Sequence, residues 1–89
     1  MIIRRSKHFT KAFDKLPKKI QEQFGDRLRL FLQNPSHSQL HIHPLKGELK
    51  GVYSINISGD YRAWFIVDSC ENDKLIQFVK IGTHSELYG

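Results

Sequence analysis

The chain has little that would cross-link its fold or anchor it in a membrane. Its single cysteine, Cys70, cannot form a disulfide within the chain, so we expect a fold without such a cross-link in a reducing compartment. No apolar run is long enough to span a bilayer, and no apolar leader-like segment stands at the N-terminus, which predicts a cytoplasmic protein. A glycine-rich phosphate loop, a serine triad signature and a paired-carboxylate signature are also missing, which argues against the enzymes built on those motifs.

Acidic residues are the second shortage. Nine Asp and Glu stand against fourteen Lys and Arg, so the net charge is +5 and the isoelectric point is near 9.6. A basic domain suits nucleic acid, an acidic protein partner, or both. The basic residues are spread from Arg4 to Lys80, which predicts a charged face on a folded body rather than a basic tail. The length predicts one domain over residues 1–89.

The first part of the chain predicts a β-prone segment and two helices. Ser6 is suited to cap the first helix, and Pro17 separates the first helix from the second. The second helix ends near Asn34, because Pro35 disfavours helical geometry in the residue before it. The apolar stripes at helical spacing are Phe9, Ala12, Phe13 and Leu16, then Ile20, Phe24, Leu28 and Phe31 widened by Leu32. Both stripes predict core packing, and residues 34–40 are predicted as a floppy loop.

From Val52 onward the apolar period changes to two, which predicts strands and an α+β fold. A three-residue loop at Ser58–Asp60 would set Ile57 against Tyr61 and Asn56 against Arg62, with Ser54 across from Trp64. A two-residue loop would set Ile55 against Arg62 and mix polar with apolar side chains, so we predict the longer loop. The next strand, residues 74–81, alternates poorly, as a strand covered on both faces does, and leaves the face of Lys80 open.

Polar residues recur at the strand ends of this predicted sheet. His43 precedes Pro44, whose ring restricts the backbone and fixes where the imidazole points, and His84 follows Gly82 at a strand end. Imidazoles titrate near neutrality and move protons, while Arg and Lys neutralise charge that builds on phosphate oxygens. The residues that suit metal-free cleavage or clamping of a phosphodiester are His43, Asp60, Arg62, Lys80, His84 and Tyr88.

Each of these residues also has a purely structural interpretation. In that interpretation Arg62 forms a salt bridge to Asp60 or Glu86, and Lys80 protects an edge strand from aggregation. The aromatic residues that either belong to the core or stack on unpaired bases are Trp64 and Tyr88.

We expect no metal site and no cofactor. His41 and His43 lie on one side of an extended segment, as a pair of metal ligands would. No third ligand stands at a recognisable spacing from them, and a surface loop that happens to hold histidines explains the pair.

Three motifs resemble those of the RelE/ParE superfamily of type II toxins, and most of all its RelE and YafQ branch. They are L-x-G-x-x-x-G-x-Y-S at residues 45–54, G-D-Y-R at residues 59–62 and G-T-H-x-x-x-[YF]-G at residues 82–89. With the helical hairpin before them, the resemblance covers nearly the whole chain. It implies two N-terminal helices on a twisted, mostly antiparallel four-stranded sheet, with a short C-terminal turn or helix.

The resemblance also implies an activity and a partner. Proteins of this branch are ribosome-dependent endoribonucleases that cut mRNA in the decoding site and are held inactive by an antitoxin encoded beside them. The catalytic positions that carry over from the YafQ pattern are His43, Asp60, His84 and Tyr88. We therefore expect the ribosome, mRNA and an acidic, partly disordered antitoxin as partners, and no membrane.

The chain departs from the family pattern at several positions. Lys80 stands where the family usually has arginine, which keeps the charge but loses the bidentate fork. Asn56 occupies a place where YafQ has histidine and RelE has lysine. Tyr61 replaces a YafQ tryptophan, and Arg62 corresponds to a RelE arginine. The residues expected to contact RNA are Lys46, Lys50, Ser54, Asn56, Tyr61 and Trp64.

The leading hypothesis is attack of a 2′-hydroxyl on its own 3′ phosphate. His43 and His84 serve as general acid and base in an order that the sequence leaves open, and Arg62 and Lys80 stabilise the transition-state charge. Two alternatives share the expected fold. One is a ParE-like inhibitor of DNA gyrase that does not cut RNA, and the other is a degenerate member that survives as an antitoxin-binding scaffold.

Overall fold

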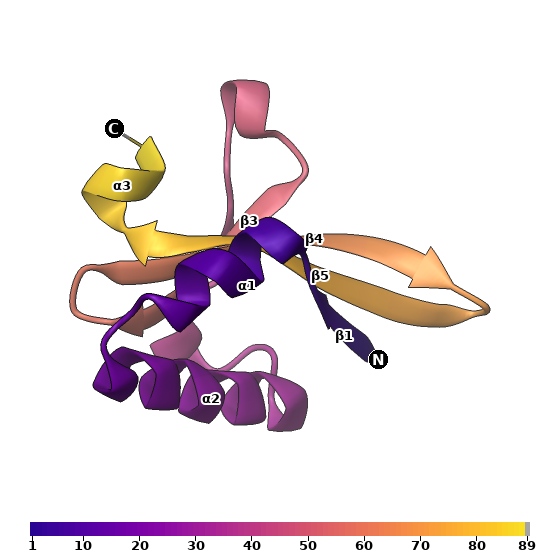
Figure 1. The fold of residues 1–89 in the computed structure, drawn as a ribbon. Helices are drawn as coiled ribbons and strands as arrows, with labels where there is room; N and C mark the ends of the chain where they lie inside the picture. The colour runs from indigo at the N-terminus through magenta and orange to yellow at the C-terminus, as the bar shows by residue number, and fades with distance from the viewer. Residues whose placement is uncertain (89) are drawn as a thin grey trace.

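A short strand leads into a helical hairpin in the computed structural model, which describes residues 1–88. The strand β1 (Ile2–Arg5) is followed by helices α1 (Lys7–Asp14) and α2 (Lys18–Gln33) (Figure 1). The Ser6 side chain caps α1 by accepting a hydrogen bond from the Phe9 backbone N–H at 3.0 Å. Pro17 directly precedes α2, which ends before Asn34. Both predicted helices are confirmed, and the closing Gly89 of the third motif lies outside the described residues.

The remaining chain builds most of a five-stranded sheet, in the order β1-β5-β4-β3-β2. Its other strands are β2 (His43–Pro44), β3 (Val52–Ser58), β4 (Tyr61–Cys70) and β5 (Asp73–Thr83), with short helices η1 (Ser38–Leu40), η2 (Gly47–Leu49) and α3 (His84–Tyr88). β1 runs parallel to β5, and the other neighbours are antiparallel. The α+β fold is confirmed. The sheet has five strands rather than the four predicted, and one of them, β2, is only two residues long.

One face of the sheet carries the hydrophobic core and is covered by the helices. Phe9 of α1 and Phe24 of α2 pack on Phe78 of β5, with ring centroids 5.7 and 5.2 Å away. The predicted stripes are therefore core, except that Leu32 is 51% exposed and does not widen the second stripe. The predicted floppy loop also differs, because η1 lies in it and the Leu40 side chain is fully buried in the core.

The register between β3 and β4 confirms two predicted pairs and corrects the turn. Asn56 lies opposite Arg62, and Ser54 lies opposite Trp64. Tyr61, however, pairs with Ser58 rather than with Ile57. The extra residue is thus a β-bulge within the strand, and the turn has two residues, because a bulge lets two residues of one strand oppose one of its partner.

A second bulge, at Val79 in β5, decides the face of Lys80. Phe78 pairs with Phe65, and Lys80 pairs with Trp64, so the register shifts by one residue between them. In a regular strand, residues three apart point to opposite faces. The shift places both Phe78 and Ile81 in the core. The poor alternation of β5 therefore reflects a bulge, not the predicted coverage of both faces. None of the helices in residues 1–88 is long and apolar enough to cross a bilayer.

Candidate active site

The sheet face opposite α1 and α2, here called the outer face, carries a row of aligned residues. His43 of β2 lies opposite Ser54 of β3, Ser54 opposite Trp64 of β4, and Trp64 opposite Lys80 of β5. Residues directly opposite one another point to the same side, so the row crosses four strands and spans about 14 Å at roughly 4.8 Å per strand. The next row holds Asn56, Arg62 and Gly82. Residues distant in the chain thus share one surface.

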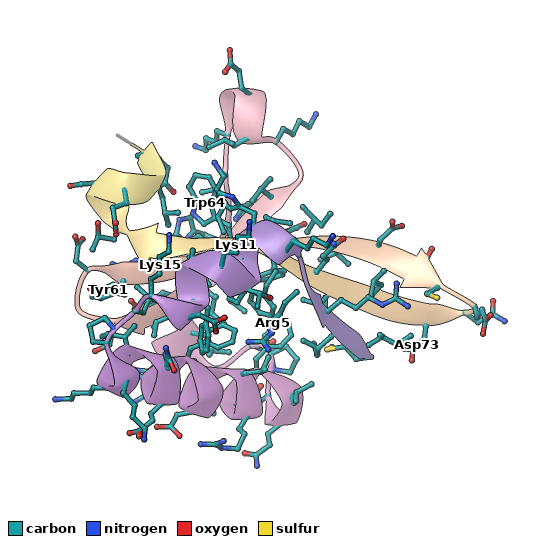
Figure 2. All side chains as sticks on the ribbon, in the orientation of Figure 1. Arg5, Lys11, Lys15, Tyr61, Trp64 and Asp73 are labelled. Atoms are coloured by element: carbon teal, nitrogen blue, oxygen red, sulfur yellow. The ribbon has the colours of Figure 1, made fainter. Side chains whose placement is uncertain are left out.

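The short helix α3 adds the second histidine to this face. The Tyr88 ring packs edge-on against Trp64 with centroids 5.1 Å apart, and the His84 ring lies on Tyr88 at 4.4 Å. The Lys80 ammonium lies 5.8 Å from the Trp64 ring centroid, within the range of a cation–π contact. In Figures 1 and 2, α3 and η2 project from the same side of the sheet, and Trp64 lies on that side. Both candidate histidines therefore belong to the outer face.

The orientation of His43 has a chemical consequence. Its Nδ1 lies 3.0 Å from the backbone carbonyl oxygen of His41. A carbonyl oxygen only accepts hydrogen bonds, so Nδ1 carries the proton in this contact. In the neutral ring Nε2 is then an unprotonated acceptor, and the His43 side chain is exposed. Nε2 of His43 is therefore available to accept a proton.

Arg62 and Asp60 both form hydrogen bonds that involve backbone groups at the turn between β3 and β4. Arg62 Nη1 donates hydrogen bonds to the carbonyl oxygens of Gly59 at 2.7 Å and Tyr61 at 2.9 Å. Neither Asp60 nor Glu86 forms a salt bridge with Arg62 among residues 1–88, so that structural interpretation does not hold. Asp60 accepts a hydrogen bond from the His84 backbone N–H at 3.0 Å through its own carbonyl oxygen. The turn before β4 thus holds the start of α3.

Three residues that were expected to contact RNA are placed differently. Ser54 is 1% exposed and Trp64 is 3% exposed, so neither contacts RNA directly in this conformation, and both instead support the outer face. Tyr61 packs against the core on the helix-covered side, as Figure 2 shows, and not on the outer face. The exposed lysines Lys46 and Lys50 flank η2, on the outer side of the sheet.

Two polar atoms of the outer face lack hydrogen-bond partners. They are Asn56 Oδ1 and Trp64 Nε1, both buried. An unpaired buried donor or acceptor costs about 1–3 kcal/mol, so a native structure keeps few of them. Their presence beside Arg62 and Lys80 indicates a site with unused hydrogen-bonding capacity.

The sequence analysis missed a capping box that holds α3 in place. The Thr83 backbone N–H donates to Glu86 Oε1 at 2.8 Å, and the Glu86 backbone N–H donates to Thr83 Oγ1 at 3.2 Å. A side chain at Gly82 would begin 3.1 Å from Glu86 Oε1, so glycine leaves room for this contact. The T-x-x-E spacing at residues 83–86 was the signal that could have revealed it. Glu86 therefore sets the position of His84 and Tyr88.

The capping box predicts a pH dependence of α3. Hydrogen bonds from the Thr83 backbone and then its hydroxyl hold the pKa of the Glu86 carboxyl below its ordinary value of 4.5. Because the pKa of Glu86 is lower in the folded than in the unfolded chain, the ionised carboxylate stabilises the folded state. This stabilisation is fully present above pH 4.5 and is lost as the pH falls through the lower folded-state pKa. We expect the NMR shifts of the α3 amides to move toward coil values over that window, with the packing of Tyr88 on Trp64 weakened.

Two variants check this pH dependence. Glu86→Gln keeps an acceptor oxygen but does not titrate, so its α3 shifts are expected to stay constant over the same window. Glu86→Ala is expected to show coil-like α3 shifts at neutral pH already. Equal pH responses in the wild type and in Glu86→Gln would mean that another group controls α3.

No group of three or more His, Cys, Asp or Glu within residues 1–88 is arranged to hold a metal ion. The donors gathered on the outer face are instead imidazoles, a lysine and an arginine. Such groups move protons and neutralise phosphate charge by themselves.

Comparisons with known proteins agree with this fold. The family model described as "ParE toxin of type II toxin-antitoxin system, parDE" matches residues 3–88. YafQ from E. coli strain BL21(DE3) superposes with a TM-score of 0.79 at 24% identity, over 98% of this chain and 97% of that chain. The YoeB/ParE toxin from Agrobacterium tumefaciens superposes with a TM-score of 0.77 at 17% identity, over 94% of this chain and 99% of that chain. A chain of the E. coli DinJ-YafQ toxin-antitoxin complex superposes with a TM-score of 0.76 at 24% identity, over 98% of this chain and 96% of that chain. No curated protein matches the chain by sequence.

Proposed function

We propose that this chain, which belongs to the ParE toxin family of type II toxin–antitoxin systems, is a ribosome-dependent endoribonuclease that cuts mRNA without a metal. The observation that carries the proposal is the gathering of His43, His84 and Lys80 on one face of the sheet. Two proton-transfer groups and a cation are what transphosphorylation of RNA requires. Structural similarity to YafQ supports the same choice within the family.

The reaction begins at the 2′-hydroxyl of the nucleotide that is cut. His43 Nε2 removes the hydroxyl proton, because its Nδ1 is already committed to the His41 carbonyl. The 2′-oxygen bonds to phosphorus, and the bond from phosphorus to the 5′-oxygen of the next nucleotide breaks. His84, in its protonated form, gives a proton to that leaving oxygen. The products are a 2′,3′-cyclic phosphate and a free 5′-hydroxyl.

The other predicted residues hold the substrate and stabilise charge. Lys80 and the free donors of Arg62 face the phosphate oxygens as negative charge builds on them. Asp60 orients His84 through its backbone carbonyl. Tyr88, 45% exposed beside His84, offers a ring on which a base can stack. The exposed groups that would contact RNA beyond the cut are Lys46 and Lys50, and Asn56 is half-buried.

The partners follow from the family and the charge. A cognate antitoxin would hold the toxin inactive, as the existence of a DinJ-YafQ complex supports. We propose that this antitoxin is acidic and partly disordered, because the toxin carries a net charge of +5. The ribosome and mRNA would be met in the cytoplasm. Binding to ribosomal RNA would weaken as the salt concentration rises.

Primer extension on cellular mRNA after induction of the chain tests the proposal. Discrete cuts that appear only in translated messages are the expected result, and products ending in a 2′,3′-cyclic phosphate would identify the reaction. Intact mRNA together with growth arrest would contradict the nuclease. Cuts of the same frequency in untranslated RNA would contradict its dependence on the ribosome.

A second candidate function is inhibition of DNA gyrase, and the match to the ParE model favours it. That function needs the basic fold but neither histidine. Induction would then trigger DNA-damage signalling with intact mRNA, so the same cultures separate the two functions. A catalytically degenerate scaffold, the third alternative, would cause no growth arrest in the absence of its partner.

A further inference from the structure

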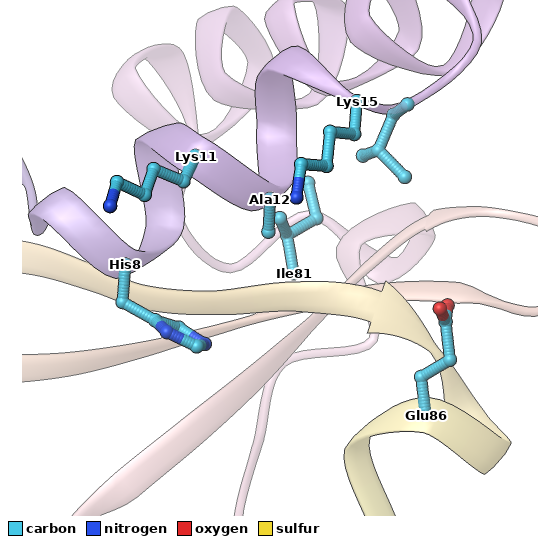
Figure 3. Close-up of a pocket in the computed structure, with 7 residues that line it drawn as sticks. His8, Lys11, Ala12, Lys15, Ile81 and Glu86 are labelled. Carbon is cyan, nitrogen blue, oxygen red and sulfur yellow. The ribbon is translucent and has the colours of Figure 1, made fainter.

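A basic depression beside α1 takes no part in the proposed reaction. It is formed by α1, the end of β5 and α3, has a volume of about 390 Å³, and is here called the α1 pocket. Figure 3 shows Lys11 and Lys15 extending from α1, with Glu86 of α3 across from them. Its lining residues are His8, Lys11, Ala12, Lys15, Leu16, Ile81 and Glu86.

The α1 pocket combines a cationic rim with an apolar floor. Lys11 of α1 and Lys15, the C-cap of α1, are four residues apart, and both are exposed. The floor is made of the aliphatic side chains Ala12, Leu16 and Ile81. Glu86, the carboxylate of the lining, already accepts a hydrogen bond from the Thr83 backbone. Because neither lysine forms a salt bridge with Glu86 or with another carboxylate within residues 1–88, the rim keeps a net positive charge above a floor that favours aliphatic groups.

The α1 pocket and the candidate active site share α3, whose Glu86 lines the pocket, but they use different sides of β5. Ile81 belongs to the core face, whereas its neighbour Lys80 lies beside Trp64 on the outer face. An occupant of the α1 pocket therefore need not compete with an RNA strand on the outer face. A nucleic-acid backbone supplies negative phosphates but no aliphatic side chain to cover the floor. An acidic peptide supplies both negative carboxylates and aliphatic side chains.

We propose that the α1 pocket binds an acidic segment of the protein partner, with an aliphatic side chain on Ala12 and Ile81 and carboxylates on Lys11 and Lys15. The choice of occupant rests on charge complementarity and on the apolar floor. The inference rests on the proposed function, since the antitoxin is the partner that would carry such a segment. It adds the place where that segment docks.

The test is an NMR titration of the isotope-labelled full chain with two probes. One probe is a short amidated peptide of glutamate and leucine, with the leucines repeating at helical spacing, and the other is a single-stranded oligouridine. We expect the peptide to shift the resonances of Ala12, Leu16 and Ile81. The oligouridine is expected to shift Lys80, His84 and Tyr88 instead.

Charge-reversal variants make the test quantitative. Lys11→Glu with Lys15→Glu is expected to weaken peptide binding roughly tenfold or more, as the loss and reversal of two ion pairs implies. The matched control, Lys18→Glu with Lys19→Glu, changes the net charge equally but lies at the start of α2, outside the pocket lining, and is expected to change the affinity by less than roughly threefold. Amide spectra of both variants verify that they fold.

Two results would overturn the inference. One is peptide binding that leaves the floor residues unshifted or that responds equally to both charge reversals. The other is a shift of the resonances of the floor residues when oligouridine is added, which would mean that the α1 pocket binds RNA. Cleavage of mRNA by the wild-type chain is measured separately, so a failed nuclease and a failed docking site give different patterns.

Discussion

Replacing His84 with alanine is expected to slow mRNA cleavage on translating ribosomes by about 10²–10⁴-fold, the contribution of one general acid or base. His84 lies on Tyr88 and is held by a backbone hydrogen bond to Asp60. Its removal deletes the proton donor for the leaving 5′-oxygen while the rest of the outer face stays in place. The measurement is the single-turnover cleavage rate on programmed ribosomes.

The control for the histidine is His37→Asn. The His37 side chain caps η1 by accepting a hydrogen bond from the Gln39 backbone, which an asparagine oxygen also does. This variant removes an imidazole away from the outer face and is expected to cleave at the wild-type rate. Undiminished cleavage by His84→Ala would remove the proposed mechanism, because a group other than His84 would then protonate the leaving 5′-oxygen.

Replacing Phe78 with alanine is expected to lower the free energy of unfolding by about 3–5 kcal/mol, the usual cost of removing a fully buried aromatic ring. Phe78 has no exposed surface, and its ring packs against those of Phe9, Phe24 and Phe65 at 5.2–5.7 Å. The total free energy of unfolding of a small domain is roughly 5–15 kcal/mol, so the variant loses a large share of its stability. Chemical denaturation followed by tryptophan fluorescence gives the value.

The matched control on the neighbouring strand is Val67→Ala. Val67 is 45% exposed, so its replacement is expected to cost less than about 1 kcal/mol. Similar losses in the two variants would mean that the aromatic cluster is not the center of the core. The comparison also concerns the site, because Phe78 fixes the part of β5 from which Lys80 and α3 follow.

The two N-terminal helices were predictable because their signals are local. A serine cap, a helical stripe and a proline break lie within a few residues of one another, and each acts on the backbone beside it. The pairing of Asn56 with Arg62 was also predictable, since a half-buried face penalises mixed polarity. The capping box of α3 was equally local and was present in the sequence as T-x-x-E.

The residue types of the candidate site were predictable, and so were the pairings of Asn56 with Arg62 and of Ser54 with Trp64, but the rest of the arrangement was not. The histidines and cations could be named, because their chemistry belongs to the side chain alone. That Trp64 is buried under Tyr88 depends on where α3 packs, and that Lys80 lies on the outer face depends on which face each position of β5 takes. A one-residue bulge reverses that face at little cost in local sequence preference, so no short pattern reveals it.

By itself, then, the sequence determined the helices, the class of the fold and the chemical groups available for a reaction, because each depends on neighbours in the chain. Only the tertiary structure decided that Lys80 joins His43 in one row, that Ser54 and Trp64 lie beneath the surface, and that a basic pocket forms between α1 and α3. The physical reason is that bulges, strand order and burial are set by contacts between residues far apart in sequence, whose free energies add up only once the sheet has formed.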